Sequence, residues 1–417
     1  NALYTNTTGG GNTAIGAYAL DSNTTASNNT AVGYAALDAN TTGTFNTAVG
    51  SGALDANTTA SYNTAVGHNS MTNTTTGFSN VAVGQNTLNA NSTGDGCTAI
   101  GYSALLSNTT ADNNTAVGRV ALELNTTGTA NTAVGSNALT VNTTADNNTA
   151  VGYNSLAANT TGHSNTAVGA YAADGLTTGY QNTAVGRHAL GAATTAEYSV
   201  AIGDKALYST TTGNKNIGIG AFAMQDNTTG FSNTAVGYSA MEKSTTSENN
   251  TAVGESAAQA ITSGNGNTAV GRRSLMALTT GNSNVSVGTE AMDAHTTGHY
   301  NTACGYAALT DQTTATGNAG FGYEAGENAT GDYNTCVGYK AGYNLISGSN
   351  NTLLGKEAVL PANNSTDTVV LGNSSIQHLR CQRSSIEGLS DQRDKTDIVD
   401  LTEGLNLINT LKPRKFT

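Results

Sequence analysis

The first chemistry that the sequence offers is N-glycosylation, because Asn followed by any residue and Thr is its acceptor signal. Asn-Thr-Thr or Asn-Ser-Thr closes a repeated phrase through the first part of the chain. The candidate acceptors are Asn6, Asn23, Asn40, Asn57, Asn73, Asn91, Asn108, Asn125, Asn142 and Asn159. We expect these asparagines to be exposed and regularly spaced, so that a glycosylating host would attach a row of glycans to them.

The same phrase also has a structural interpretation. After Asn159 the asparagine is often replaced, whereas the following Thr persists and is followed by Gly, Ala or Ser. The replacing residues are Leu176, Ala193, Thr210, Ser244, Ile261, Leu278, His295 and Gln312. If glycosylation explained the phrase, Asn would persist. A ladder of hydroxyl groups that ends in a turn residue explains the pattern better. We therefore favour the structural interpretation for the phrase as a whole and keep glycosylation for its first half.

Other reactive residues form no constellation that predicts a catalytic or metal site. Four cysteines are scattered along the chain: Cys97, Cys304, Cys336 and Cys381. Cys304 and Cys336 stand two repeats apart, roughly 9 to 10 Å, which is too far for a disulfide. The six histidines lack ligand spacing, so we expect no metal. We expect Arg272 and Arg273 to be solvated, and no enzyme activity or cofactor in the repeats.

A repeat organises most of the chain. A glycine recurs every 17 residues from Gly16 to Gly322 and then, after one 16-residue step, at three more positions ending with Gly372. An apolar residue, usually Val or Ile, precedes each of the 22 glycines, and Leu or Met follows most of them by four residues. Ala2 and Leu3 fit the middle of a unit, so we expect the chain to be a fragment of a longer array.

A period of 17 is too short for a helical repeat and predicts an all-β parallel β-solenoid of about 22 coils over residues 1–372. In each unit the segment NTAVG is a predicted strand, with Thr and Val on one side and Ala on the other. Glycine bends the chain, and segments such as YAAL are expected to form a second short strand. We expect Val on Val and Leu on Leu to form the core, with Asn and Thr ladders between coils.

The NTAVG run, followed by a small residue and Leu, resembles the SVAIG-type repeat in the heads of trimeric autotransporter adhesins. Those heads fold as left-handed parallel β-rolls joined three around an axis, so the resemblance implies a homotrimer. A column of alanines (Ala14, Ala31, Ala48, Ala65) would permit close approach of neighbouring chains at the trimer interface. The alternative is that the alanines are interior and the rod is monomeric.

Beyond the repeats, a transition segment at 373–389 leads to a charged segment at 390–417, whose leucines and isoleucine at helical spacing predict a short helix. The runs SDQRDK and GLNLINTLKPRKF resemble the start of the intramolecular chaperone domain of phage tail fibres, tailspikes and endosialidases. In that family the domain trimerises the chains and then cuts itself away. The resemblance implies that Ser390 is the nucleophile and Lys395 its base, with cleavage before Asp391; the lysine must be kept neutral by burial.

Charge and composition limit the partners. The formal net charge of −12 and the absence of a Lys and Arg cluster argue against a nucleic-acid partner. No apolar run reaches the roughly 20 residues that a spanning helix needs, so we expect no membrane insertion. We therefore interpret the chain as the shaft of a trimeric extracellular fibre, viral or phage tail-fibre-like, which serves reach, display and attachment. Its partner is itself, as a homotrimer or a longer filament; its receptor or glycan is unknown.

Two alternatives stay open. One is a bacterial or algal cell-surface adhesin or extracellular filament. The other is an ice-binding or glycan-binding β-solenoid, although rows of Thr-x-Thr, which a flat ice-binding face would present, are missing from the repeat.

Overall fold

The computed structural model describes residues 1–378, and residues 1–373 form one compact unit. Within the described residues the regular elements are 22 three-residue strands, and there is no helix. The strands are β1 (Thr13–Ile15), β2 (Thr30–Val32), β3 (Thr47–Val49), β4 (Thr64–Val66), β5 (Val81–Val83), β6 (Thr98–Ile100), β7 (Thr115–Val117), β8 (Thr132–Val134), β9 (Thr149–Val151), β10 (Thr166–Val168), β11 (Thr183–Val185), β12 (Val200–Ile202), β13 (Ile217–Ile219), β14 (Thr234–Val236), β15 (Thr251–Val253), β16 (Thr268–Val270), β17 (Val285–Val287), β18 (Thr302–Cys304), β19 (Ala319–Phe321), β20 (Thr335–Val337), β21 (Thr352–Leu354) and β22 (Val369–Leu371).

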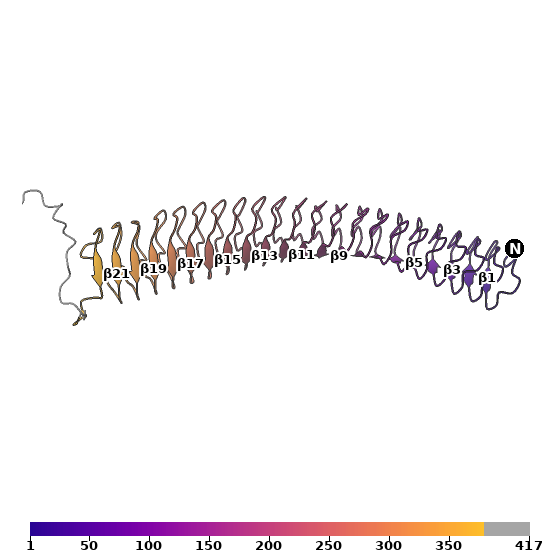
Figure 1. The fold of residues 1–417 in the computed structure, drawn as a ribbon, viewed down its shortest axis with the longest axis horizontal. Helices are drawn as coiled ribbons and strands as arrows, with labels where there is room; N and C mark the ends of the chain where they lie inside the picture. The colour runs from indigo at the N-terminus through magenta and orange to yellow at the C-terminus, as the bar shows by residue number, and fades with distance from the viewer. Residues whose placement is uncertain (379–417) are drawn as a thin grey trace, which may run out of the picture. The chain divides into compact units, whose positions relative to one another are not determined.

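All of the strands belong to one parallel sheet, in which each strand pairs with the next one along the chain (Figure 1). The register places equivalent residues side by side, as Ala31 beside Ala48. The single 16-residue repeat also stays in register, because Ala319 pairs with Thr335. Each repeat is therefore one coil, and the prediction of a parallel β-solenoid is confirmed.

Each coil contains one strand, so the prediction of a second strand in YAAL is wrong. In this segment Ala35 and Leu37 have φ values of 52° and 53°. These values lie in the left-handed region, which an extended strand does not use. The segment is a turn that brings Ala36 and Leu37 into the core, where both are fully buried.

The side chains of each strand face the opposite way from the prediction. The middle residue of the strand faces inward, and Ala31, Ala48 and Ala65 are completely buried. Val49, at the end of its strand, is 36% exposed on the outside. The core therefore consists of Ala on Ala and Leu on Leu, because the interior of a 17-residue coil already holds Leu and two asparagines and has room only for a small residue opposite them. The interior alternative for the alanine column is confirmed, and its proposed role as a contact between chains is wrong.

The recurring glycine follows each strand, where consecutive coils approach closely. Gly135 has a φ of 140°, and a Cβ atom built on it would lie 2.3 Å from the carbonyl oxygen of Gly152 in the next coil. Both the backbone conformation and the space exclude a side chain here.

Candidate functional site: the outer face of the sheet

The outer face of the sheet consists of the first and third residues of each strand, which alternate with the buried alanine. The first residue is Thr in 16 of the 22 strands and is Val81, Val200, Ile217, Val285, Ala319 or Val369 in the others. The third residue is Val or Ile in 18 strands and is Cys304, Phe321, Leu354 or Leu371 in the others. We call these two columns the outer sheet face.

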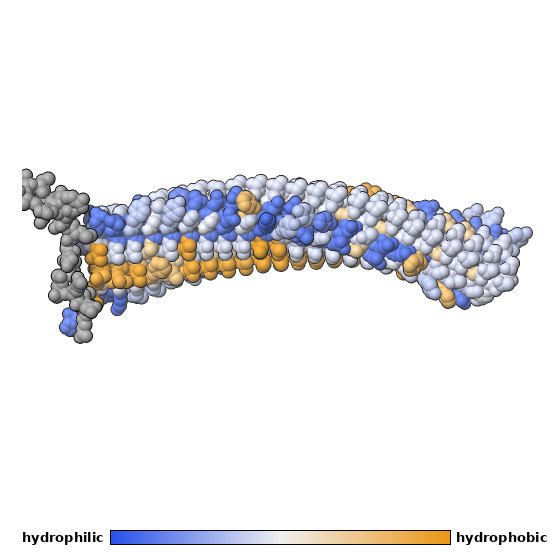
Figure 2. All heavy atoms as spheres, viewed as in Figure 1, coloured by the Kyte–Doolittle hydropathy of each residue, from blue (hydrophilic) through white to orange (hydrophobic). Residues whose placement is uncertain are grey.

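The outer sheet face carries no charge, and its third-position column is apolar and continuous. None of its positions holds a charged residue, although the chain contains 28 acidic and 16 basic residues. Its third-position side chains are substantially exposed, as shown by 37% for Val83 and 41% for Phe321. Figure 2 shows a hydrophobic band along the part of the solenoid where Figure 1 places β13 to β21. A continuous exposed apolar strip of this length is unusual for a protein surface that faces only water.

The threonines of this face have unused hydrogen-bonding groups. Side-chain hydroxyls elsewhere in the coil bond across coils; Thr41, for example, donates to the carbonyl oxygen of Thr58 at 3.0 Å. This contact repeats along the described coils, which confirms the predicted hydroxyl ladder. The hydroxyls of first-position threonines such as Thr47 make no such bond within the described chain. They are available to water or to a partner.

The asparagines of the glycosylation signal lie in the core, so the expectation that they are exposed is wrong for most of them. Eight have no exposed surface: Asn23, Asn40, Asn57, Asn91, Asn108, Asn125, Asn142 and Asn159. The amide nitrogen of Asn40 donates to the side-chain oxygen of Asn23 and to the carbonyl oxygen of Gly43, both at 3.0 Å. This nitrogen is the atom that would carry a glycan, and here it stabilises the core instead.

Asn6 and Asn73 are the two candidates that are not buried; Asn6 is partly covered and Asn73 is exposed. If the folded chain carries N-glycans at any of the ten positions, we expect them at these two. The sequence does contain a sign that this asparagine column is buried. Asn is later replaced by Leu176, Ile261 and Leu278, and an apolar substitute indicates an inward-facing column.

A second buried asparagine column joins three coils at each step. The backbone nitrogen of Asn46 donates to the side-chain oxygen of Asn29 at 2.9 Å, and its amide nitrogen donates to the carbonyl oxygen of Ala60 at 2.8 Å. These bonds satisfy polar groups that would otherwise be buried without partners. They also fix the position of each strand, and therefore of the outer sheet face.

One coil interrupts the buried ladder of glycosylation-signal asparagines that contains Asn23 and Asn40. Asn73 stands one residue early, so Thr74 occupies the inward position, where it is fully buried. The side-chain oxygens of Asn57 and Thr74 have no hydrogen-bond partner. We expect Thr74→Asn to reconnect Asn57 with Asn91 and to stabilise the shaft by about 1–2 kcal/mol. The denaturation midpoint would rise, whereas Thr76→Asn at an exposed position in the same loop would leave it unchanged. An unchanged midpoint in the Thr74 variant would contradict the ladder.

His295 replaces asparagine in the same inward column. It is fully buried, with Nε2 3.3 Å from the amide nitrogen of Asn301 and with no partner for Nδ1. Burial lowers the pKa of its imidazole, and nearby His299 acts in the same direction. Among residues 1–378, no group of three or more His, Cys, Asp or Glu side chains is arranged to hold a metal ion.

This histidine predicts acid sensitivity. Because its pKa is lower in the folded chain than in the unfolded chain, the unfolded state gains the proton first as the pH falls. The stability is complete above the ordinary histidine pKa of about 6.5 and decreases below it. We expect the melting temperature of His295→Gln to fall less than that of the wild type between about pH 7.5 and pH 5. His163→Gln, at an exposed position, serves as the control, and equal losses in all three proteins would contradict the prediction.

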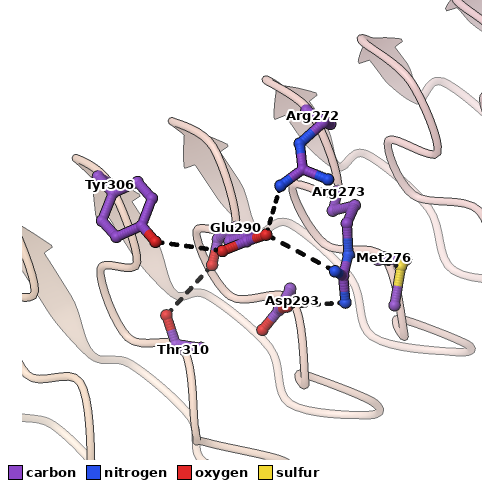
Figure 3. A network of polar contacts seen from close by, with 7 residues as sticks. All are labelled: Arg272, Arg273, Met276, Glu290, Asp293, Tyr306 and Thr310. Atoms are coloured by element: carbon purple, nitrogen blue, oxygen red, sulfur yellow. Dashed lines mark hydrogen bonds and ion pairs between the residues drawn. The ribbon is translucent and has the colours of Figure 1, made fainter.

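Arg272 and Arg273 form a polar network that bridges neighbouring coils (Figure 3). Glu290 accepts ion pairs from both, at 2.6 Å from Arg272 and 3.6 Å from Arg273. Arg273 also pairs with Asp293 at 3.5 Å. Both arginine side chains stay partly exposed to solvent, as expected, and they also form these ion pairs. Because the pairs join neighbouring coils, the network strengthens coil stacking. Each pair is partly exposed and contributes at most about 1 kcal/mol.

The cysteines fill positions in the repeat. Cys97 and Cys336 are buried and free, and burial raises the pKa of their thiols to about 11 and about 12. Cys304 is free and exposed, in the third position of β18. Cys381 and the predicted dyad of Ser390 and Lys395, with the bond before Asp391, lie outside the described residues.

Within residues 1–378 no helix is long and apolar enough to cross a membrane. No protein-family model and no curated protein matches the chain.

Proposed function

We propose that this chain is the shaft of a homotrimeric extracellular fibre, viral or phage tail-fibre-like, which serves reach, display and attachment. The observation that carries the proposal is the unbroken register of one parallel sheet through 22 strands, together with its charge-free outer face. A cellular adhesin or extracellular filament would use the same shaft. The origin of the fibre would be read from the particle or cell to which its ends are attached.

The stacking supports a mechanical role. Backbone hydrogen bonds between successive strands run along the stacking direction, and the asparagine and threonine ladders add bonds in the same direction. Each coil contacts only its neighbours, so length is added without a new core. A single narrow solenoid buries little surface per coil, and three associated chains would bury more.

Native mass measurement tests the trimer directly. The purified shaft should have three times the chain mass of 41.9 kDa at all concentrations above the micromolar range. A mass of one chain would contradict the proposal.

The resemblance to the chaperone domain adds an autocleavage step to the proposal. In a protein that carries the complete domain, we expect one cut before Asp391, with the hydroxyl of Ser390 as nucleophile and Lys395 as base. Ser390→Ala and Lys395→Arg should each prevent the cut and still yield trimers, because guanidinium stays protonated. Normal cutting by Lys395→Arg would exclude Lys395 as the base.

Ice binding is a second candidate, favoured by one observation. The sequence lacks Thr-x-Thr rows, but the outer sheet face presents rows of Thr-x-Val in register on a single parallel sheet, with free threonine hydroxyls. Thermal hysteresis of the purified shaft would support this function.

A further inference from the structure

We infer that the outer sheet face is the surface through which the three copies of this chain meet, with the sheets turned toward a common axis. This inference rests on the proposed trimer and identifies its interface. The occupant of the face is therefore a second and a third copy of the chain.

The distribution of charged residues favours this face as the contact between chains. The chain carries a formal net charge of −12, so parallel copies repel one another wherever their acidic residues approach. Acidic and basic side chains occupy other parts of the coil, as in the pairs Arg187 with Asp204 and Lys340 with Glu324. The outer sheet face has no charge from β1 to β22. It is a surface on which identical acidic chains can approach closely along their whole repeat.

The area of the face supplies a substantial part of a stable interface. If each third-position side chain leaves roughly 40 Å² of apolar surface in water, the 22 residues offer roughly 900 Å² per chain. In a trimer each chain divides this area between two neighbours, so the third column supplies roughly 450 Å² to each contact, about half of the roughly 800 Å² that each partner buries in a standard interface. The first-position threonines add to this area, and their free hydroxyls can bond across the interface.

The periodicity of the face selects another copy over an unrelated protein. The face repeats one pair of side chains at every coil, and successive strands are spaced at about 4.8 Å. A globular partner would cover a few coils and leave the rest exposed. A parallel copy has the same spacing at every coil and therefore matches the face over its full length.

Charge substitutions on the face test the inference. The triple variant Val49→Lys, Val83→Lys and Val168→Lys places three charges at residues that are 36–37% exposed. A matched variant, Tyr34→Lys, Leu124→Lys and Tyr153→Lys, changes exposed apolar residues outside the face. We expect a threefold lower native mass for the first variant, an unchanged mass for the second, and the β-sheet circular dichroism of a folded shaft for both. A folded trimer in the first variant would overturn the inference.

Cross-linking provides a test that does not depend on a substitution in the face. Cys304 is exposed in the third column, whereas Cys97 and Cys336 are buried. In a Cys381→Ala background, a short bismaleimide should link two chains of the native trimer through Cys304, and Cys304→Ala should abolish the link. A trimer that forms no link would overturn the inference while leaving the proposed function intact. A monomeric wild type would instead contradict the proposed function.

Ice is the competing occupant. If the triple lysine variant retains its trimeric mass but loses thermal hysteresis shown by the wild type, the face binds ice and the inference is overturned.

Discussion

Ala65→Asp is expected to unfold the coils around β4, whatever the assembly state of the chain. Ala65 is completely buried and pairs in register with Ala48 and Ala82. The variant would place a carboxylate in an apolar column with no cation beside it, at a cost of more than about 4 kcal/mol. Limited proteolysis should cut the variant near residue 65, and its melting temperature should fall sharply.

Thr59→Asp introduces the same charge at an exposed position in the preceding turn and is the control. We expect it to retain the wild-type melting temperature. A folded but monomeric Ala65→Asp protein would place the alanine column between chains, which would contradict its position in the core.

Gly135→Ala is expected to destabilise the shaft by about 3 kcal/mol or more, although it adds only one methyl group. Gly135 has a φ of 140°, and the new Cβ atom would collide with the backbone of Gly152, which cannot rotate away as a side chain can. Either the coils separate at this point or the strand β8 loses its register. Urea denaturation would measure the loss.

Gly10→Ala is the matched control, because a Cβ atom at Gly10 meets nothing within 4 Å. We expect that variant to remain within about 0.5 kcal/mol of the wild type. Equal losses at the two positions would show that the glycine column does not mark close contact between coils.

The periodic sequence was sufficient to predict the solenoid, because a fixed spacing of glycine, apolar residue and asparagine constrains every coil in the same way. It was not sufficient to predict which side of the strand faces inward. Alternation places Ala31 and Val32 on opposite sides but does not identify the inside, and hydrophobicity alone favours Val. The deciding factor is the space left in the coil by Leu37 and the asparagines, which depends on the turn.

The turn itself cannot be predicted from the sequence. Ala35 and Leu37 adopt left-handed backbone conformations that non-glycine residues rarely use, so neither residue type indicates them. The sequence does not reveal directly that Asn40 is buried, since Asn-Thr-Thr is a familiar surface signal. The substitution of Leu176 in the same column was the available clue, and it supported the structural ladder.

Cryo-electron microscopy of the purified full chain tests the central proposal most directly. Cross-sections perpendicular to the fibre should contain three coils, with one strand of each chain nearest the axis and Val134 among the residues that meet there. The charged turns, such as the one that contains Arg272 and Glu290, should lie on the periphery. Cross-sections with a single coil, or with three coils whose sheets face the solvent, would contradict the proposed fibre and its interface, respectively.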